Sequence, residues 1–284
     1  MSLHPPRSSA TAASGWRDET VDLPGVGATR LRISGCAARS AATPLVLHFH
    51  AGAFTAGSVD DAAATTGALV DAGAAVASID YPLAPARPFP QAAEAGYAAL
   101  GWLERKRRRL AGAHGPLLVA GEEAGGNLAA AVAMMARDRG GPAVAGAVLL
   151  SPMLDVCVGT ASQRGALRGP VGCPWADGWR AYLARDADAL HPNAAPAGAL
   201  RLAGLPPTLL ISAEDDPLRD ETRAFATRLR AAGVEADTVL LRLPTGWPRS
   251  YREAGAAPWA GALAAPIAAF LERILQRHSD RSPA

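Results

Sequence analysis

The sequence predicts an α/β fold built on a mostly parallel sheet. Short apolar runs bounded by Gly or Pro, such as 45–50, alternate with helix-forming segments of about ten or more residues, such as 91–110. Such alternation forms right-handed βαβ units, which make the strands parallel. The chain has 284 residues, of which 49% are hydrophobic and 19% charged, so it can bury a large globular core.

The first half of the chain is expected to begin with two strands joined by a turn. The turn is the Pro-Gly-Val-Gly segment at 24–27, whose residue types favour chain reversal. After it, apolar runs predict strands, and Ala-rich segments closed by Gly or by basic residues predict helices. In chain order, the strands are expected at 19–23, 29–33, 45–50, 75–79 and 117–120, and the helices at 62–72 and 91–110.

The second half continues this alternation on both sides of an irregular segment. Gly, Pro and Trp interrupt the pattern from 153 to 199, so we interpret 154–199 as a small inserted cap whose best helix is 175–185. Elsewhere, the helices are expected at 128–137, 221–232 and 258–277, and the strands at 145–150, 208–212 and 238–243. We therefore expect about eight strands with helices on both faces, in a single domain over 1–284 with a flexible lead at 1–18.

Composition narrows the classes of function. A formal net charge of +2 is too small to indicate a nucleic-acid or membrane-surface partner. The three cysteines, Cys36, Cys157 and Cys173, lack metal-ligand spacing, and their odd number fits a reducing compartment. The N-terminus lacks the apolar core of a signal peptide, and no charge-free apolar run reaches about 18 residues. We therefore expect a cytoplasmic protein without a metal or cofactor.

The segment 121–128, Gly-Glu-Glu-Ala-Gly-Gly-Asn-Leu, contains the most informative motif. A sharp strand-to-helix turn of the form G-x-S-x-G presents the nucleophilic serine of α/β-hydrolases, and small flanking residues make that turn sterically possible. Here the small residues are present, but Glu123 stands at the position of the serine. The pattern predicts the turn and excludes serine chemistry on it.

Four blocks of sequence resemble the hormone-sensitive-lipase-like family of α/β-hydrolases, which includes bacterial esterases and acetyl-hydrolases. They are His-Ala-Gly-Ala-Phe at 50–54, Asp-Tyr-Pro-Leu-Ala-Pro at 80–85, the turn at 121–128, and the segment 205–221. The resemblance covers most of the chain, from about residue 19 to the C-terminal helix. It implies the α/β-hydrolase fold and, for the family, the hydrolysis of carboxylic esters.

The resemblance fails at the catalytic positions. It places Asp216 at the acid of the triad and the catalytic His about thirty residues later, where this chain has Gly246. No histidine lies between His191 and His278, so a small alignment shift does not supply one. Because the His of a Ser-His-Asp triad moves the proton and the Asp orients it, we do not expect turnover of ordinary esters.

The resemblance also assigns an oxyanion loop. His50 would hold this loop by hydrogen bonds, while Gly52, Ala53 and Ala124 would supply amides to the oxyanion. Alanine resists the positive φ that glycine tolerates, so Ala53 predicts a strained or rearranged hole. His48, two residues before His50 on a buried strand, is expected to be a hydrogen-bonded core residue.

Several roles for Glu123 stay open. It could bind a cation, an amine or a metal, it could be a nucleophile, or it could act as a general acid or base in lyase, cyclase or decarboxylase chemistry. It could also be a drifted residue that plugs a disused site. Glu122 is expected to be a structural hydrogen-bonding residue, and a cation site made of Glu122, Glu123 and Asp216 is a further option without a spacing signature.

Our first hypothesis is a catalytically degenerate relative of the carboxylesterases that keeps a small-molecule ligand in the former acyl pocket. The alternatives are an enzyme of altered chemistry that uses Glu123, and a structural or protein-docking role, with a homodimer as one form. Only a short polar segment precedes residue 19, which predicts an open pocket mouth. Four aromatic residues are candidates to line it: Trp175, Trp179, Tyr182 and Trp247. Without a His partner, Asp216 is expected to cap a loop or to pair with Arg219, Arg249 or Arg252.

Overall fold

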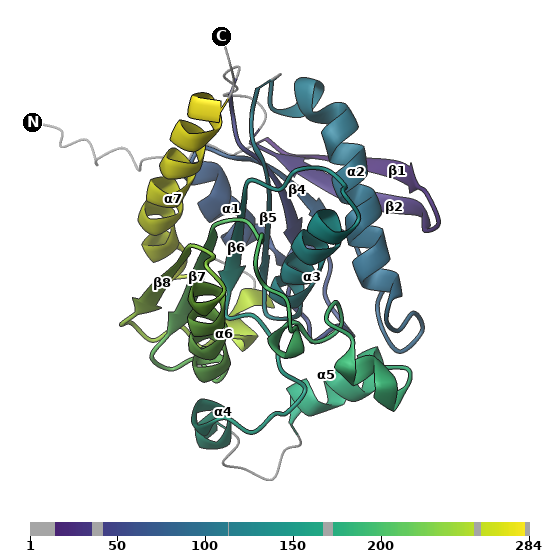
Figure 1. Cartoon of the computed structure of the whole chain (residues 1–284), viewed down its shortest axis with the longest axis vertical. Helices are drawn as coiled ribbons and strands as arrows, with labels where there is room; N and C mark the ends of the chain where they lie inside the picture. The colour runs from purple at the N-terminus through teal and green to yellow at the C-terminus, as the bar shows by residue number, and fades with distance from the viewer. Residues whose placement is uncertain (1–14, 36–41, 113, 167–172, 253–256, 282–284) are drawn as a thin grey trace, which may run out of the picture.

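Eight strands form one sheet in the order β1-β2-β4-β3-β5-β6-β7-β8 (Figure 1). The computed structural model describes residues 15–35, 42–112, 114–166, 173–252 and 257–281. β1 and β2 pair antiparallel, as do β2 and β4, and every other neighbouring pair is parallel. The predicted fold class, a mostly parallel α/β sheet of the α/β-hydrolase type, is confirmed.

The described elements follow the predicted order. The strands are β1 (Arg17–Leu23), β2 (Gly27–Ser34), β3 (Leu45–Phe49), β4 (Ala75–Ile79), β5 (Leu117–Glu122), β6 (Gly146–Leu150), β7 (Thr208–Ala213) and β8 (Ala236–Leu241). The helices are α1 (Ala63–Asp71), α2 (Gln91–Leu110), α3 (Ala124–Asp138), α4 (Ala161–Ala166), α5 (Pro174–Tyr182), α6 (Arg219–Ala231) and α7 (Ala260–Arg281).

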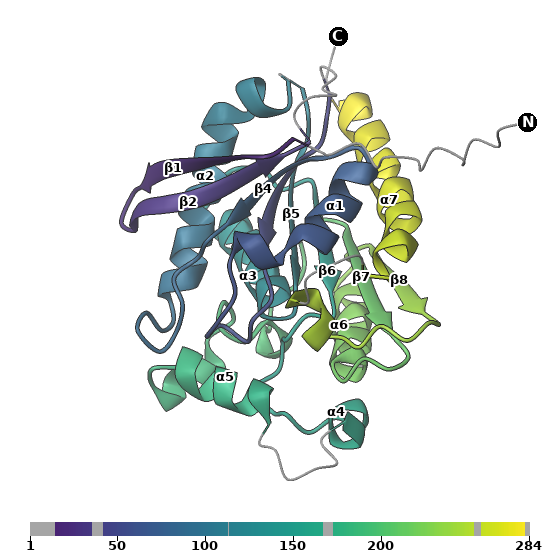
Figure 2. The ribbon, with the colours of Figure 1, turned by 180° about the vertical axis from the view of Figure 1, so that it is seen from behind.

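Helices cover both faces of the sheet. α2, α3 and α6 lie on the face toward the viewer in Figure 1, and α1 and α7 lie on the opposite face in Figure 2. Every residue of β3, β4, β5, β6 and β7 is buried, because a parallel strand covered on both faces has no polar side. The core therefore consists of two apolar layers, one on each face of the sheet.

The differences from the predicted boundaries have physical causes. β1 already begins at Arg17, so the predicted flexible lead at 1–18 is too long by two residues, and residues 1–14 lie outside the described chain. α3 begins at Ala124 and not at 128. Its first turn is rich in glycine, which has a low helix propensity, so the sequence pattern does not indicate a helix there. Close packing requires these glycines.

The segment 154–199, predicted as a cap, contains α4, α5 and two short 3₁₀ helices at Asp186–Leu190 and Pro196–Gly198. It lies at the carboxyl ends of the parallel strands (Figure 1). α5 is capped by Cys173, whose sulfur accepts the amide of Ala176 at 3.4 Å, and Pro174 follows as the first helical residue. The cap lies next to the turn that follows β5, because Trp175 in α5 bonds to Glu123 in that turn.

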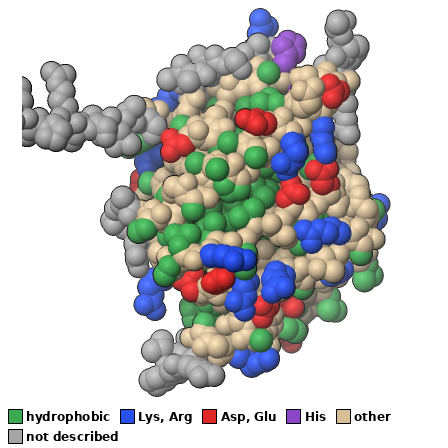
Figure 3. Space-filling view, turned by 90° about the vertical axis from the view of Figure 1, so that its left-hand side faces the viewer, with side chains coloured by type: hydrophobic (Ala, Val, Ile, Leu, Met, Phe, Trp, Pro, Cys, Tyr) green, Lys and Arg blue, Asp and Glu red, His purple; other side chains and the backbone are tan. Residues whose placement is uncertain are grey.

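The surface on the side of α7 and β8 has mixed charge. Figure 3 shows basic and acidic side chains interspersed around an apolar centre on that face. Ion pairs join α7 to the β8 edge of the sheet, including Arg277 with Glu235 at 2.5 Å and Arg273 with Asp237. Of the helices in the described ranges, none combines the length and apolarity needed to span a bilayer.

Candidate functional site

Glu123 connects the end of β5 to the start of α3 with a left-handed backbone, at φ 54° and ψ −117°. Two glycines make this turn sterically possible. A Cβ on Gly121 would overlap the carbonyl oxygen of Gly125, and a Cβ on Gly125 would overlap that of Phe49. The sequence pattern small-x-Glu-x-small therefore folds into the strained strand-turn-helix geometry in which α/β-hydrolases hold their nucleophile.

The Glu123 carboxylate is surrounded by N–H donors. Its Oε2 accepts the backbone amides of Gly52 at 2.6 Å and Ala53 at 2.8 Å. Its Oε1 accepts the indole N–H of Trp175, on the cap, at 3.2 Å. The residue is only 6% exposed. One side chain thus links the turn, the loop after β3 and the cap.

Burial raises the pKa of Glu123 above its ordinary value. The three N–H groups oppose this shift because they favour the ionised form, whereas the charge of Glu122 adds to it. The site is therefore an apolar enclosure with a donor set suited to a carboxylate.

The loop that supplies the two amides is held by its own backbone. Gly52 has φ 138°, and Ala53 and Phe54 have φ 47° and 64°, so Ala53 adopts the positive φ that alanine disfavours. The amides of Thr55 and Ala56 donate to the Gly52 carbonyl at 2.9 and 3.0 Å. These bonds fix the direction of the amides that point at Glu123. The strain predicted from the Ala residues is present as positive φ.

Glu122, the residue before Glu123, has structural partners of its own. Its Oε2 lies 2.7 Å from His48 Nε2, and its Oε1 accepts the amide of Ala51 at 3.3 Å. His48 Nδ1 lies 2.9 Å from the hydroxyl of Ser78. As predicted, Glu122 hydrogen-bonds within the structure and His48 is a bonded core residue.

His50 anchors the loop. Its Nδ1 lies 2.8 Å from the carbonyl oxygen of Ala51, and its ring stacks on Tyr81 with centroids 4.1 Å apart. The hydroxyl of Tyr81 donates to the carbonyl oxygen of His50 at 2.9 Å. Burial lowers the pKa of His50, so the ring is held in its neutral form.

Asp216 lies on the other side of the turn. Its Oδ1 accepts the hydroxyl of Ser151 at 2.7 Å and the amide of Leu218 at 2.8 Å. Of the two expected roles, Asp216 has the first: it caps a loop through the Leu218 amide, and among the described residues no arginine pairs with this buried carboxylate. Burial raises the pKa of Asp216 to about 6.

Gly246, at the position expected for the His, bonds to the residue that precedes Asp216. It is exposed with φ 68°, and its amide donates at 2.9 Å to the neighbouring carboxylate, Asp215. From this segment, the buried Tyr251 is the group near Asp216. Burial raises the pKa of Tyr251 well above its ordinary value, and the charge of Asp216 adds to the shift.

Sequence reasoning missed Ser151 and Tyr251. Ser151 follows β6 just as Glu123 follows β5, so the pairing of these parallel strands was a usable signal. It also has a positive φ of 45°. Tyr251 gave only a weak signal, as an aromatic residue in a segment rich in Arg, Pro and Gly.

Aromatic side chains of the cap pack against the loop that bonds to Glu123. The ring of Phe54 stacks on Tyr182 with centroids 3.9 Å apart, and it is tilted against Trp179 at 5.2 Å. Trp247 does not join them, because it packs against Tyr251 and Trp259 in the other core layer. Within the described ranges Glu123 is thus nearly buried, and the expected open mouth is not found there.

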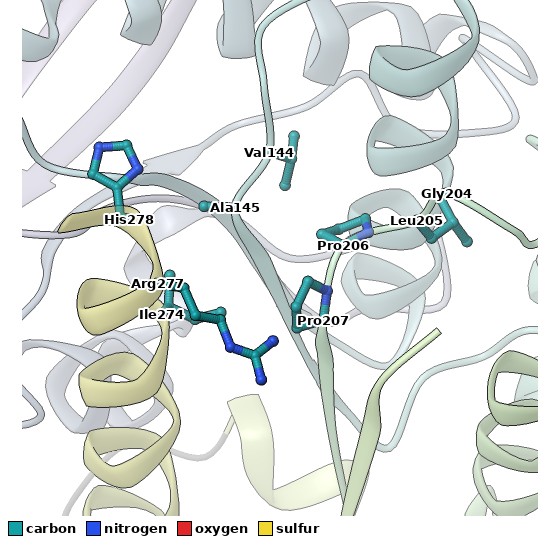
Figure 4. Close-up of a pocket in the computed structure, with 9 residues that line it drawn as sticks. All are labelled: Val144, Ala145, Gly204, Leu205, Pro206, Pro207, Ile274, Arg277 and His278. Carbon is teal, nitrogen blue, oxygen red and sulfur yellow. The ribbon is translucent and has the colours of Figure 1, made fainter. Parts of the chain in front are cut away.

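A cavity lies elsewhere, between the starts of β6 and β7 and the C-terminal part of α7 (Figure 4). Its volume is about 270 Å³, and it is lined by Val144, Ala145, Gly204, Leu205, Pro206, Pro207, Ile274, Arg277 and His278. None of the predicted site residues lines it. Within the described ranges, no three His, Cys, Asp or Glu side chains are grouped to hold a metal ion, which counts against the cation site of Glu122, Glu123 and Asp216.

Curated relatives include enzymes and a receptor. The carboxylic ester hydrolase LipN of Mycobacterium tuberculosis is 39% identical over 212 residues, which cover 69% of this chain and 54% of LipN. The carboxylesterase NlhH of the same species is 34% identical, over 68% of this chain and 63% of NlhH. The gibberellin receptor GID1B of Arabidopsis thaliana is 31% identical, over 71% of this chain and 59% of the receptor. This chain thus spans less than two thirds of each relative's length.

Solved esterase structures match the whole fold. A fungal esterase from Rhizomucor miehei superposes with a TM-score of 0.85 at 26% identity, covering 96% of this chain and 87% of the esterase. The thermostable carboxylesterase EstE1, from a metagenomic library, has a TM-score of 0.81 at 33% identity, with 92% and 90% covered. A family model with the description alpha/beta hydrolase fold matches residues 46–242. This span contains all four sequence blocks. The chain therefore belongs to this esterase-containing family of the α/β-hydrolase fold.

Proposed function

We propose that this chain is a non-hydrolytic member of its family that acts by binding. The observation that carries the proposal is the position of Glu123 Oε2, which accepts both amides of the loop after β3. In a serine esterase such amides stabilise the oxyanion of the tetrahedral intermediate. Here a carboxylate of the protein itself takes those bonds, so the Gly52 and Ala53 amides are not free to polarise an ester carbonyl.

Proton transfer is also unsupported. The triad mechanism needs a base that accepts a proton near neutral pH. Asp216 is bonded to Ser151 and Leu218, and the nearby Tyr251 has a pKa raised by burial, so its phenol stays protonated. Among the described residues, no histidine bonds to Asp216, so this carboxylate has no imidazole to orient.

The alternative in which Glu123 performs acid or base chemistry has less support. A general acid or base must reach a substrate atom within hydrogen-bonding distance. Both carboxylate oxygens of Glu123 already accept protein N–H groups, and aromatic side chains enclose the residue.

Binding is favoured by one relative, since GID1B is named a receptor and keeps 31% identity with this chain. The partner we propose is a small molecule in the former acyl pocket, under the cap. Because Phe54, Trp179 and Tyr182 pack closely there, a ligand requires these side chains to move apart. A cytoplasmic location and a homodimer remain part of the proposal.

An ester-hydrolysis assay tests the absence of turnover. With p-nitrophenyl acetate, we expect neither a burst nor a steady rate above that of buffer, and a fluorophosphonate should leave the chain unlabelled. An active carboxylesterase run in parallel verifies the reagents. Stoichiometric fluorophosphonate labelling, located by mass spectrometry on a residue of the site, would refute the proposal.

A further inference from the structure

The donors around Glu123 constitute a recognition site in their own right. Gly52 and Ala53 offer two amides to one oxygen, and Trp175 offers an indole N–H to the other. Each of these groups only donates. A carboxylate, whose two oxygens only accept when ionised, is the ligand that matches such a set.

The two amides keep their positions without help from Glu123. The loop is closed by the bonds from Thr55 and Ala56 to the Gly52 carbonyl. A Cβ on Gly52 would overlap the carbonyl oxygen of Ala56, so the backbone is tightly packed there. Successive amides in a positive-φ segment form a concave site for anions. The donor set is therefore preorganised.

The third donor is positioned by the cap. Trp175 lies in the first turn of α5, and this helix packs directly on the loop, since a Cβ on Gly178 would lie 2.5 Å from the Ala53 carbonyl oxygen. Trp175 is 5% exposed. Its indole thus donates to the other oxygen of the carboxylate that the two amides hold.

We propose that these three N–H groups form a binding site for a small aliphatic carboxylate, in which the Glu123 side chain is the resident occupant. This inference rests on the proposed function, because a hydrolytic site would keep the amides free for a substrate. It names the chemical class of ligand that the site takes when the side chain of residue 123 is absent or displaced. Being tethered, Glu123 has a high effective concentration at the donors and outcompetes free carboxylates in the natural chain.

Removing the occupant tests the proposal. In Glu123→Gly, the turn keeps its positive φ, which glycine adopts freely, and the three donors lose their acceptor. We expect sodium acetate or formate to raise the Tm of this variant by roughly 2–4 °C at saturation, the shift of a modestly stabilising ligand on a chain of this size. Sodium chloride at equal ionic strength is the salt control. The natural chain, whose site is filled, should show no acetate-specific shift.

Two further variants keep the test decisive. If Glu123→Gly does not fold, Glu123→Ser removes the carboxylate with a smaller change in volume and is measured in the same way. Glu123→Gly combined with Trp175→Phe should bind acetate roughly 2- to 10-fold more weakly, the loss expected for one hydrogen bond. The proposal is overturned if acetate stabilises neither single variant beyond chloride, or if it stabilises the natural chain equally. Both of these outcomes are distinguishable from a failure of the proposed function, because the proposed function is tested by ester turnover and not by acetate binding.

Discussion

Glu123 shows how a single side chain can occupy the hydrogen-bond donors of its own site. The turn presents residue 123 toward the loop amides, and a serine there would leave them free for a substrate. A glutamate is longer, so its carboxylate reaches the amides of Gly52 and Ala53 and continues to the indole of Trp175. The consequence is that all three donors bond to an acceptor from the chain itself.

A comparison of two neighbouring tryptophans measures how much the indole hydrogen bond contributes to the free energy of unfolding. Trp175 Nε1 donates to Glu123, whereas Trp179 Nε1 is buried and, among the described residues, meets no acceptor. Both residues lie in α5 and both are buried, so substitution by Phe removes a similar volume from each. We expect Trp175→Phe to lower the free energy of unfolding by about 1 kcal/mol more than Trp179→Phe. Urea denaturation of both variants measures the difference, and equal losses would show that the bond contributes nothing.

At the scale of elements, the sequence predicts the scaffold well and the site only in part. Buried parallel strands are continuous apolar runs, so β3, β4 and β6 were located within one residue at each end. The turn at 121–126 was recognisable from its glycines, which close packing requires both within the turn and against β3. Local patterns carry this information, and the fold follows from it.

The hydrogen-bond partners of the Glu123 side chain cannot be predicted from the residues next to it in the sequence. Its acceptor atoms meet donors about 70 and 52 residues away along the chain, and only the assembled sheet and cap bring these together. The surroundings of Asp216 were missed for a related reason. Counting residues from Asp216 leads to Gly246, which bonds to Asp215, and gives no sign that Tyr251 enters the site. Contacts across loops of variable length cannot be predicted by spacing.

The contact of α5 with the loop after β3 is testable by a pair of glycine substitutions. In Gly178→Ala the new Cβ would lie 2.5 Å from the Ala53 carbonyl oxygen, so α5 must shift from the site; we expect a loss of about 1–3 kcal/mol. Gly67→Ala in α1 meets no atom within 4 Å and should instead stabilise by up to about 1 kcal/mol through helix propensity. Thermal unfolding distinguishes the two. A stabilised Gly178→Ala would mean that α5 packs less closely on the loop than described.

At the scale of the whole molecule, buried carboxyl groups tie the cap to the main sheet. Glu221, in the first turn of α6, accepts the amides of Leu154 and Asp155 at 3.2 and 2.9 Å, where the cap begins. Burial raises the pKa of Glu221 to about 8. The folded chain therefore holds a proton at a pH where the unfolded chain has released it, so the stability of the fold depends on pH through this contact.

The sign of that dependence follows from linkage. A carboxyl group with a raised pKa in the folded state binds more protons folded than unfolded, so its contribution is complete below its ordinary pKa and is lost as pH rises through the folded value. His50, whose pKa is lowered by burial, acts in the opposite sense, but only below about pH 6.5, the ordinary pKa of histidine.

Between about pH 6.5 and 8, we therefore expect the free energy of unfolding to fall with a slope of up to about 1.4 kcal/mol per pH unit from Glu221. Glu221→Gln should flatten this slope, because an amide does not ionise, whereas the exposed Glu214→Gln should leave it unchanged. Urea denaturation across this pH range measures the slopes, and a slope that persists in Glu221→Gln would assign the pH dependence to another group.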